Sequence, residues 1–310
     1  MKIFAVVVTY NGSQWIKKCL NSLVNSSLKL DILVIDNNSN DKTLEIIREN
    51  FTQIKVFNLN KNLGFGKANN IGIRYAIENN ADYIFLLNQD AWIEKDVIEI
   101  LVNNAEKNPD YAILSPMQYY NRNTLDYKFK NYFKNGVLNK NGIVDVHFVN
   151  AAIWLVRANS FKAHGMFHEC FTHYGEDQEL CLRYTKKNEK IGIIKIAIGF
   201  HDRPQKEKLI TKESIYKQSQ IRLLIRLCSM EINFIRGFLS LIKYLISKRS
   251  NFDDKYVFLY RINVLFKSLP IYCRNRNKHY LWHRKNQRET KKKQLYKENL
   301  NNLRIEIKKH

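Results

Sequence analysis

The stretch YIFLLNQD, residues 83–90, decides the fold, because four apolar residues from Ile84 to Leu87 run into a polar triplet that ends in Asp90. A continuous apolar run with polar ends is typical of a central parallel strand buried on both faces. Ligands of open α/β sheets bind beyond the carboxyl ends of such strands. There, Asp90 could hold a divalent cation that takes its other ligands from phosphate and water. The alternative is that Asp90 only caps the following helix.

Strands and helices alternate around this stretch. The periodicity predicts strands at 3–8, 32–35, 55–59 and 83–87, and helices that start with Ser13 as an N-cap and continue at 41–49, 67–78 and 96–105. Alternation of this kind implies right-handed crossovers and a mostly parallel sheet. The predicted fold class is therefore α/β, with a Rossmann-like, mostly parallel sheet flanked by helices.

The rhythm changes after Pro109. A strand is expected at 111–116, a loop or hairpin over the sheet at 118–141, strand character at 144–156, a helix from Gly175 to Tyr184 and a strand at 191–198, with helices from Ser214 onward. We predict a catalytic domain at 1–205 and a basic, amphipathic helical region at 206–310. Aromatic side chains in the middle of the chain are either a platform on which a ligand stacks or ordinary packing: Tyr119, Tyr120, Tyr127, Phe129, Tyr132, Phe133 and Trp154.

The 310-residue chain has a formal net charge of +22, which calls for an anionic partner: nucleic acid, a membrane surface or a phosphorylated substrate. Residues 271–310 contain 13 Lys and Arg against 3 Glu, a net charge of +10, so much of the excess lies in the tail. The 5 cysteines form no C-x-x-C pair and suggest no disulfide framework, which favours a reducing cytoplasm. Arg236 and Lys243 interrupt the best candidate for a spanning helix.

Polar clusters follow the first three strands as well. They are Thr9-Tyr10-Asn11, Asp36-Asn37 and the run from Asn62 to Gly66. All would lie at the same edge of the sheet as Asp90, and a nucleotide needs such a surface, with acceptors for base and ribose and glycines where the backbone approaches the ligand. Turn chemistry alone explains each cluster separately. Four polar strand ends in series favour a nucleotide site.

Five motifs in order resemble the family 2 inverting glycosyltransferases, and most closely their rhamnosyltransferase-like branch. The motifs are Val7 to Asn11, Val34 to Ser39, Asn62 to Gly72, Leu87 to Asp90 and Tyr174 to Arg183, and they cover roughly the first two thirds of the chain. The resemblance implies a GT-A fold, a nucleoside-diphosphate sugar donor and Mg²⁺ or Mn²⁺.

The resemblance also implies roles for individual residues. Asp36 would contact the nucleobase, and Asp90 and His201 would hold the metal. Other motif residues would line the donor pocket: Thr9, Tyr10, Asn11, Asn37, Asn62, Gly64, Phe65, Asn69 and Gln89. Asn88 departs from the commoner family pattern, which has an aspartate there, and leaves the cation one fewer negative charge. A structural role for the lone His201 is the alternative.

An inverting transfer needs a base that removes the proton of the acceptor hydroxyl as it attacks the anomeric carbon. The resemblance places this base at Asp177, with Glu176 orienting the acceptor or replacing Asp177. Acidic residues in a first helical turn are also favoured by the helix dipole without any catalysis. That alternative explains the two carboxylates but not the whole motif from Gly175 to Arg183.

Together these patterns predict a metal-dependent inverting glycosyltransferase that builds cell-surface polysaccharide. The expected donor is dTDP-L-rhamnose, or a UDP-linked sugar, and the acceptor a saccharide or a polyprenyl-diphosphate-linked saccharide. Because the resembling branch is implied to work at the cytoplasmic face, the basic tail would hold the enzyme on the inner face of the cell membrane rather than bind nucleic acid. The alternative for the tail is a helix that is only solvated. The alternatives are a non-enzymatic nucleic-acid-binding protein and a sugar-nucleotide nucleotidyltransferase, although residues 9–13 are not the glycine-rich phosphate loop of the latter.

Overall fold

The computed structural model describes residues 1–171, 174–203 and 212–229, together with residues 235, 237, 239, 242–243, 262–266, 268–270 and 273. Most of the helices expected at 232–246 and 256–265 lie outside these residues, as does the basic stretch after residue 273. No helix in the described part of the chain is long and apolar enough to cross a membrane.

The amino-terminal half of the sheet consists of four parallel strands in the order β3-β2-β1-β4. These strands are β1 (Ile3–Thr9), β2 (Asp31–Asp36), β3 (Lys55–Asn58) and β4 (Tyr83–Asn88), and the helices between them are α1 (Ile16–Val24), α2 (Thr43–Asn50) and α3 (Phe65–Glu78). The central strands are continuous apolar runs in the sequence, because their side chains are buried on both faces of the sheet. The prediction of alternating strands and helices is confirmed.

The prediction of Ser13 as an N-cap is wrong. Helix α1 begins at Ile16, and the preceding turn closes on the carbonyl of Gly12, which accepts hydrogen bonds from the amides of Trp15 and Ile16. The amide of Ser13 instead donates to Asp41 Oδ2 at 3.0 Å. A contact across two loops has therefore taken the place of a local cap.

The carboxyl-terminal half of the sheet is mixed, in the order β4-β10-β6-β11-β9-β8. Strand β10 lies antiparallel between β4 and β6, whereas β6 and β11 are parallel. The elements are β5 (Ala91–Ile93), α4 (Val97–Lys107), β6 (Tyr111–Asn121), β7 (Thr124–Leu125), β8 (Val137–Leu138), β9 (Ile143–Asp145), β10 (Ile153–Arg157) and β11 (Lys190–His201). The α/β class with a mostly parallel sheet is confirmed.

Two predictions in this half need correction. The strand character expected at 144–156 is confined to β9 and β10, which are separate strands, since β9 pairs with β11 while β10 pairs with β4. The segment 118–141 is not only a loop or hairpin, because it also contains helix α5 (Tyr127–Lys134). Asp126 caps this helix by accepting hydrogen bonds from the amides of residues 128 and 129, and the ring of Phe129 is fully buried.

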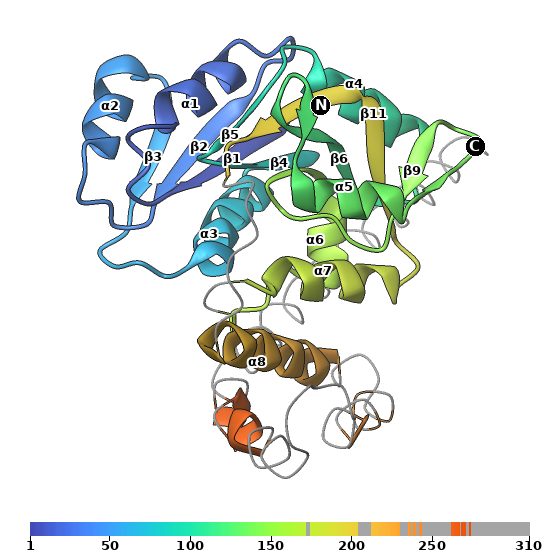
Figure 1. Ribbon diagram of the computed structural model, residues 1–310. Helices are drawn as coiled ribbons and strands as arrows, with labels where there is room; N and C mark the ends of the chain where they lie inside the picture. The colour runs from blue at the N-terminus through green and yellow to red at the C-terminus, as the bar shows by residue number, and fades with distance from the viewer. Residues whose placement is uncertain are drawn as a thin grey trace, which may run out of the picture.

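Two apolar cores lie on opposite faces of the sheet. Side chains of α1, α2 and α4 pack on one face, and side chains of α3, α5, α6 (Ala158–His164) and α7 (Glu176–Thr185) pack on the other. In Figure 1, α1 and α2 lie above the sheet, and α3, α6 and α7 lie below it. Helix α3 packs so closely against β1 that a Cβ on Gly72 would come within 2.4 Å of Val6 Cγ1.

Helix α8 (Lys212–Ser229) lies beyond α7, on the side away from the sheet (Figure 1). A third, smaller core joins it to the segment that precedes α7, with Phe171 packed among Leu223, Leu224 and Leu227. The start of α7 is therefore supported from the sheet on one side and from α8 on the other.

Candidate active site

The polar strand ends meet at one edge of the sheet, as predicted. Thr9 pairs with Asp36 at the ends of β1 and β2, and Val8 pairs with Asn88 at the end of β4. Because the three strands are parallel, their carboxyl ends open on the same side. The turn 89–90 then carries the chain from β4 into β5 and places Asp90 at that edge.

Gln89 ties the ends of β1 and β4 together. Its Oε1 accepts a hydrogen bond from Thr9 Oγ1 at 2.6 Å and from the amide of Tyr10 at 2.8 Å, and its Nε2 donates to the carbonyl of Tyr10 at 3.1 Å. A Cβ on Gly12 would come within 2.3 Å of the same Oε1. Three of the predicted donor-binding residues therefore hold one another in place and shape this part of the edge.

The predicted asparagines also brace loops. Asn37 Nδ2 donates to Asn62 Oδ1 at 2.8 Å, and the same oxygen accepts from the amide of Gly64 at 2.9 Å. Asn11, with φ of 49°, donates its amide to Ser39 Oγ at 3.0 Å. Asparagine tolerates this left-handed conformation better than most residues. These side chains build the cradle at the sheet edge, and any contact with a donor stays a prediction.

Asp36 differs from its neighbours. Its side chain is buried, and Oδ2 accepts a hydrogen bond from the amide of Ser39 at 3.0 Å. The other oxygen, Oδ1, is also buried and has no hydrogen-bond partner among the described residues. A buried acceptor without a donor costs free energy, so the site favours a ligand that supplies an N–H or O–H group. A nucleobase N–H fits this requirement.

The start of α3 adjoins the start of α7. A Cβ on Gly66 would lie 3.2 Å from Phe167 Cβ and 3.5 Å from Glu176 Cβ. The predicted residues Phe65 and Asn69 serve this junction, because the Phe65 ring packs edge-on against Phe167 at 5.7 Å, and Asn69 Nδ2 donates to the carbonyl of Phe65. These contacts bring the sheet edge close to the start of α7, where Glu176 and Asp177 lie.

Asp90 and His201 form the candidate metal pair. Asp90 Oδ1 and His201 Nε2 are 3.5 Å apart, and the amide of Asp202 donates to the carbonyl of Asp90 at 2.8 Å. Donor atoms that share one Mg²⁺ at about 2.1 Å each lie no more than about 4.2 Å apart, so the pair fits a single cation. One carboxylate and one imidazole leave the remaining positions to phosphate and water.

Two residues behind this pair were missed by the sequence reasoning. Asp126 is fully buried, its Oδ2 lies 4.0 Å from His201 Nδ1, and both of its oxygens accept hydrogen bonds from Arg203. The Arg203 guanidinium compensates the charge of this buried carboxylate, which would otherwise be strongly destabilising behind the imidazole. The sequence held a partial signal for Asp126, because an aspartate directly before a short aromatic helix is a typical N-cap. It held no signal for the contact with His201.

Glu176 and Asp177 open helix α7 as predicted. Glu176 is buried and Asp177 is half-buried. Burial raises the pKa of both carboxyl groups, and the neighbouring charge of Asp177 raises that of Glu176 further. The ammonium group of Lys128, on α5, opposes the rise in the pKa of Asp177. A carboxylate with a raised pKa is a better proton acceptor than an ordinary aspartate, which is the property that a general base requires.

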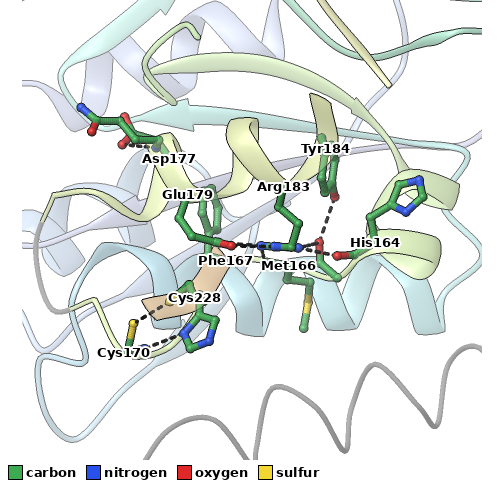
Figure 2. A network of polar contacts seen from close by, with 12 residues as sticks. His164, Met166, Phe167, Cys170, Asp177, Glu179, Arg183, Tyr184 and Cys228 are labelled. Atoms are coloured by element: carbon green, nitrogen blue, oxygen red, sulfur yellow. Dashed lines mark hydrogen bonds and ion pairs between the residues drawn. The ribbon is translucent and has the colours of Figure 1, made fainter. Parts of the chain in front are cut away.

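The second half of the Tyr174–Arg183 motif is structural. The Arg183 guanidinium pairs with the Glu179 carboxylate at 2.8 Å, and it donates hydrogen bonds to the carbonyls of His164, Gly165 and Met166. Figure 2 shows the carboxylate, the guanidinium and these carbonyls in line along α7, with Asp177 pointing away from them. Arg183 and Glu179 therefore anchor α7 and leave its first two carboxylates to face elsewhere.

The model of the family described as "Glycosyl transferase family 2" matches residues 4–165 of this sequence. The chain belongs to glycosyl transferase family 2. The matched segment contains every predicted donor-binding residue and Asp90, whereas Glu176, Asp177 and His201 lie beyond it.

Two relatives in this family extend the comparison. "dTDP-rhamnosyl transferase RfbF" of Shigella flexneri is 30% identical over 190 residues, which are 58% of this chain and 62% of the relative. "Low-salt glycan biosynthesis hexosyltransferase Agl10" of Haloferax volcanii is 24% identical over 64% of this chain and 66% of its own length. The chain thus spans less than two thirds of each.

Solved structures show the same fold. The S. aureus TarS 1–349 structure matches with a TM-score of 0.56 and 18% identity, over 86% of this chain and 72% of TarS 1–349. GalNAc-T7, solved with UDP, GalNAc and Mn²⁺, matches with a TM-score of 0.59 and 13% identity, over 85% of this chain and 54% of its own. The GT-A fold expected from the family resemblance is confirmed.

The aromatic side chains of this family 2 member divide into two groups. Trp154 and Phe129 are fully buried, and Trp154 stacks on Phe167 with ring centroids 6.1 Å apart, so packing explains both. Tyr132 packs on Phe129 and Phe148, and the charge of Asp177 contributes, after burial, to a raised pKa of its hydroxyl. Packing therefore accounts for the ring of Tyr132 too, and a role in stacking on a sugar stays a prediction.

A cavity of about 720 Å³ has Asp202, the residue after His201, in its lining. Its lining includes Trp92 stacked on Phe200 at 5.6 Å, and Lys18 Nζ 3.3 Å from the Trp92 ring centre. Tyr120, one of the candidate stacking aromatics, lines the cavity together with Asp202, whereas none of the predicted donor-binding, metal or catalytic residues does. The predicted donor site is the open sheet edge rather than this cavity.

Proposed function

We propose that this chain transfers a sugar from a nucleoside-diphosphate donor to a hydroxyl group of a saccharide acceptor, with inversion at the anomeric carbon and dependence on a divalent cation. One observation carries the proposal. The unpartnered Oδ1 of Asp36 and the Asp90–His201 pair lie at the same sheet edge, and the carboxylates of Glu176 and Asp177 adjoin it. The reaction needs three parts: a carboxylate oxygen that accepts a hydrogen bond from the nucleobase, a pair of residues that binds the diphosphate through a cation, and a general base that takes the proton.

The reaction follows from these positions. The acceptor oxygen attacks the anomeric carbon from the face opposite the diphosphate, a new C–O bond forms, and the bond to the diphosphate oxygen breaks with its electron pair on that oxygen. Asp177, as the general base, takes the proton of the acceptor hydroxyl. Asp36 holds the nucleobase of the donor so that its diphosphate reaches Asp90 and His201. A bound Mg²⁺ or Mn²⁺ would neutralise charge on the leaving diphosphate.

The finer proposal is that the donor is dTDP-L-rhamnose and that the product extends a cell-surface polysaccharide. Similarity to a relative named as a dTDP-rhamnosyl transferase supports the sugar. A UDP-linked sugar is the alternative, since TarS, which shares the fold, was solved with UDP-GlcNAc. The net charge of +22 supports an acceptor linked to polyprenyl diphosphate and work at the inner face of the cell membrane.

The test is protection from thermal unfolding by dTDP, UDP, GDP and CDP, each with and without Mn²⁺. A ligand that binds only the folded state stabilises it by about 2.7 kcal/mol at a hundredfold excess over its dissociation constant. We expect protection by dTDP, or by UDP, that Mn²⁺ strengthens, and we expect Asp90→Ala to abolish this effect of Mn²⁺. Asp36→Ala should weaken protection whether or not Mn²⁺ is present.

The control is Asp110→Ala, which removes an exposed carboxylate paired with Lys190 at a distance from the edge and should leave nucleotide protection unchanged. Protection by all four nucleotides alike would contradict base recognition by Asp36. No protection by any nucleotide, together with salt-sensitive binding to DNA or RNA, would overturn the proposed function.

A further inference from the structure

Three metal-binding side chains converge below α7, away from the sheet edge. They are His168 and Cys170, from the segment before α7, and Cys228, from the last turn of α8. One ligand atom from each lies within 4.8 Å of the other two, and all three side chains are buried. Figure 2 shows Cys170 and Cys228 facing each other across the gap between the two elements.

The distances match a tetrahedral thiolate site. Cys170 Sγ and Cys228 Sγ are 3.6 Å apart. Two sulfurs bound to one zinc ion at about 2.3 Å each lie roughly 3.8 Å apart in a tetrahedron, whereas a disulfide requires about 2.0 Å. The two sulfurs are thus already spaced for a shared zinc ion, whereas a disulfide would need them to approach by roughly 1.6 Å.

The charges match as well. Cys170 Sγ lies within hydrogen-bonding distance of Cys228 Sγ, and the amide of Cys170 donates to His168 Nδ1 at 3.3 Å, so the three residues already contact one another. Thiolates are the form that binds metals, and two thiolates with a neutral imidazole give a neutral site with Zn²⁺. The nearby charges of Glu179 and Arg183 already pair with each other. A dication here would therefore leave no uncompensated charge in the buried segment.

We propose that His168, Cys170 and Cys228 bind a structural zinc ion that fastens α8 to the segment leading into α7. The fourth tetrahedral position is left to water or another donor. The ion would also support the start of α7. Gly175, the residue before Glu176, packs so closely against α8 that a Cβ on it would lie 2.5 Å from Ile221 Cγ2. Loss of the ion would loosen α8 and with it the turn that aims Glu176 and Asp177.

The experiment measures zinc in the full chain, purified with a thiol reductant and without chelators. Elemental analysis should find one zinc ion per chain in the wild type, and Cys170→Ser and Cys228→Ser should each lose most of it. Cys181→Ser is the matched control, because Cys181 is an equally buried thiol in α7 outside the cluster, and it should keep the metal.

Cobalt substitution keeps the proposal testable if the serine variants fold poorly. Co²⁺ added to chelator-treated wild type should produce the intense near-ultraviolet absorption of a cobalt–thiolate bond and the visible bands of a tetrahedral site. Mn²⁺ or Mg²⁺ at Asp90 and His201 gives neither signal, so failure of the zinc site and failure of the proposed catalytic metal are distinguishable. Wild type without zinc and without the cobalt–thiolate bands would overturn the proposal, as would a Cys170–Cys228 disulfide in the unreduced protein.

Discussion

The Asp90 carboxylate and the His201 imidazole face each other from the ends of two strands, with Oδ1 and Nε2 3.5 Å apart. Backbone pairing creates this contact, because Ala91 of β5 lies opposite His201 of β11 in an antiparallel ladder. The side chains are therefore held at the sheet edge before any ligand arrives, and ligands that are held in place bind at a smaller entropic cost.

Removing either member of this pair should weaken metal-dependent nucleotide binding. We expect the dissociation constant for dTDP or UDP with Mn²⁺, measured by calorimetry, to rise at least about tenfold in Asp90→Asn and in His201→Gln. Binding without Mn²⁺ should change much less, since Asp36 is untouched. Equal losses with and without the metal would show that the two residues support the fold rather than the cation.

Asp177→Asn should lower kcat by about 10²–10⁴ and leave the donor KM nearly unchanged, because a general base acts only in the transition state. Steady-state kinetics with a saccharide acceptor measure both constants. Glu176→Gln is the comparison, and its loss should be smaller. If Glu176→Gln loses more of kcat than Asp177→Asn, then Glu176 is the base.

Stability should depend on pH through Glu176. Burial, and after it the charge of Asp177, raise the folded-state pKa above the unfolded value of about 4.3. The contribution of this group to stability is therefore full below about pH 4.3 and is lost as the pH rises through the folded-state pKa. We expect Glu176→Gln to unfold at a higher temperature than wild type at alkaline pH, with a difference that shrinks toward pH 5. A difference that does not change with pH would contradict the raised pKa.

Arg183→Met should destabilise the fold by about 3–5 kcal/mol, because it leaves the Glu179 carboxylate buried without its partner. Urea unfolding followed by circular dichroism measures the loss. The double variant Glu179→Met with Arg183→Met should be more stable than Arg183→Met alone, since no buried charge then remains. Equal stability of the single and the double variant would show that the carbonyl contacts, and not the ion pair, matter.

The first half of the fold could be predicted from the sequence, because a strand that is buried on both faces is a continuous run of apolar residues. Helix α5 could not, since its stability rests on the Asp126 cap and the burial of Phe129 rather than on a clean apolar periodicity. The insertion of β10 between β4 and β6 also leaves no local signal, because it depends on which strand edges are free when the chain returns.

The site was predictable in position more than in detail. Strand ends in series located Asp36 and Asp90, but an asparagine that braces a loop, such as Asn37, has the same sequence signature as one that binds a ligand. The contacts of Asp126 with His201 and Arg203 join residues far apart in the chain. Only the folded sheet brings the three side chains into contact.

The place of β10 has a consequence for synthesis of the protein. Strand β4 leaves the ribosome before β10 exists, and its apolar residues Ile84 to Leu87 then have an open backbone edge on that side. Open edges of this kind recruit strands from other chains. Fragments that stop before residue 153 would keep this edge open permanently, so a nucleotide-binding half expressed alone should aggregate where the full chain folds.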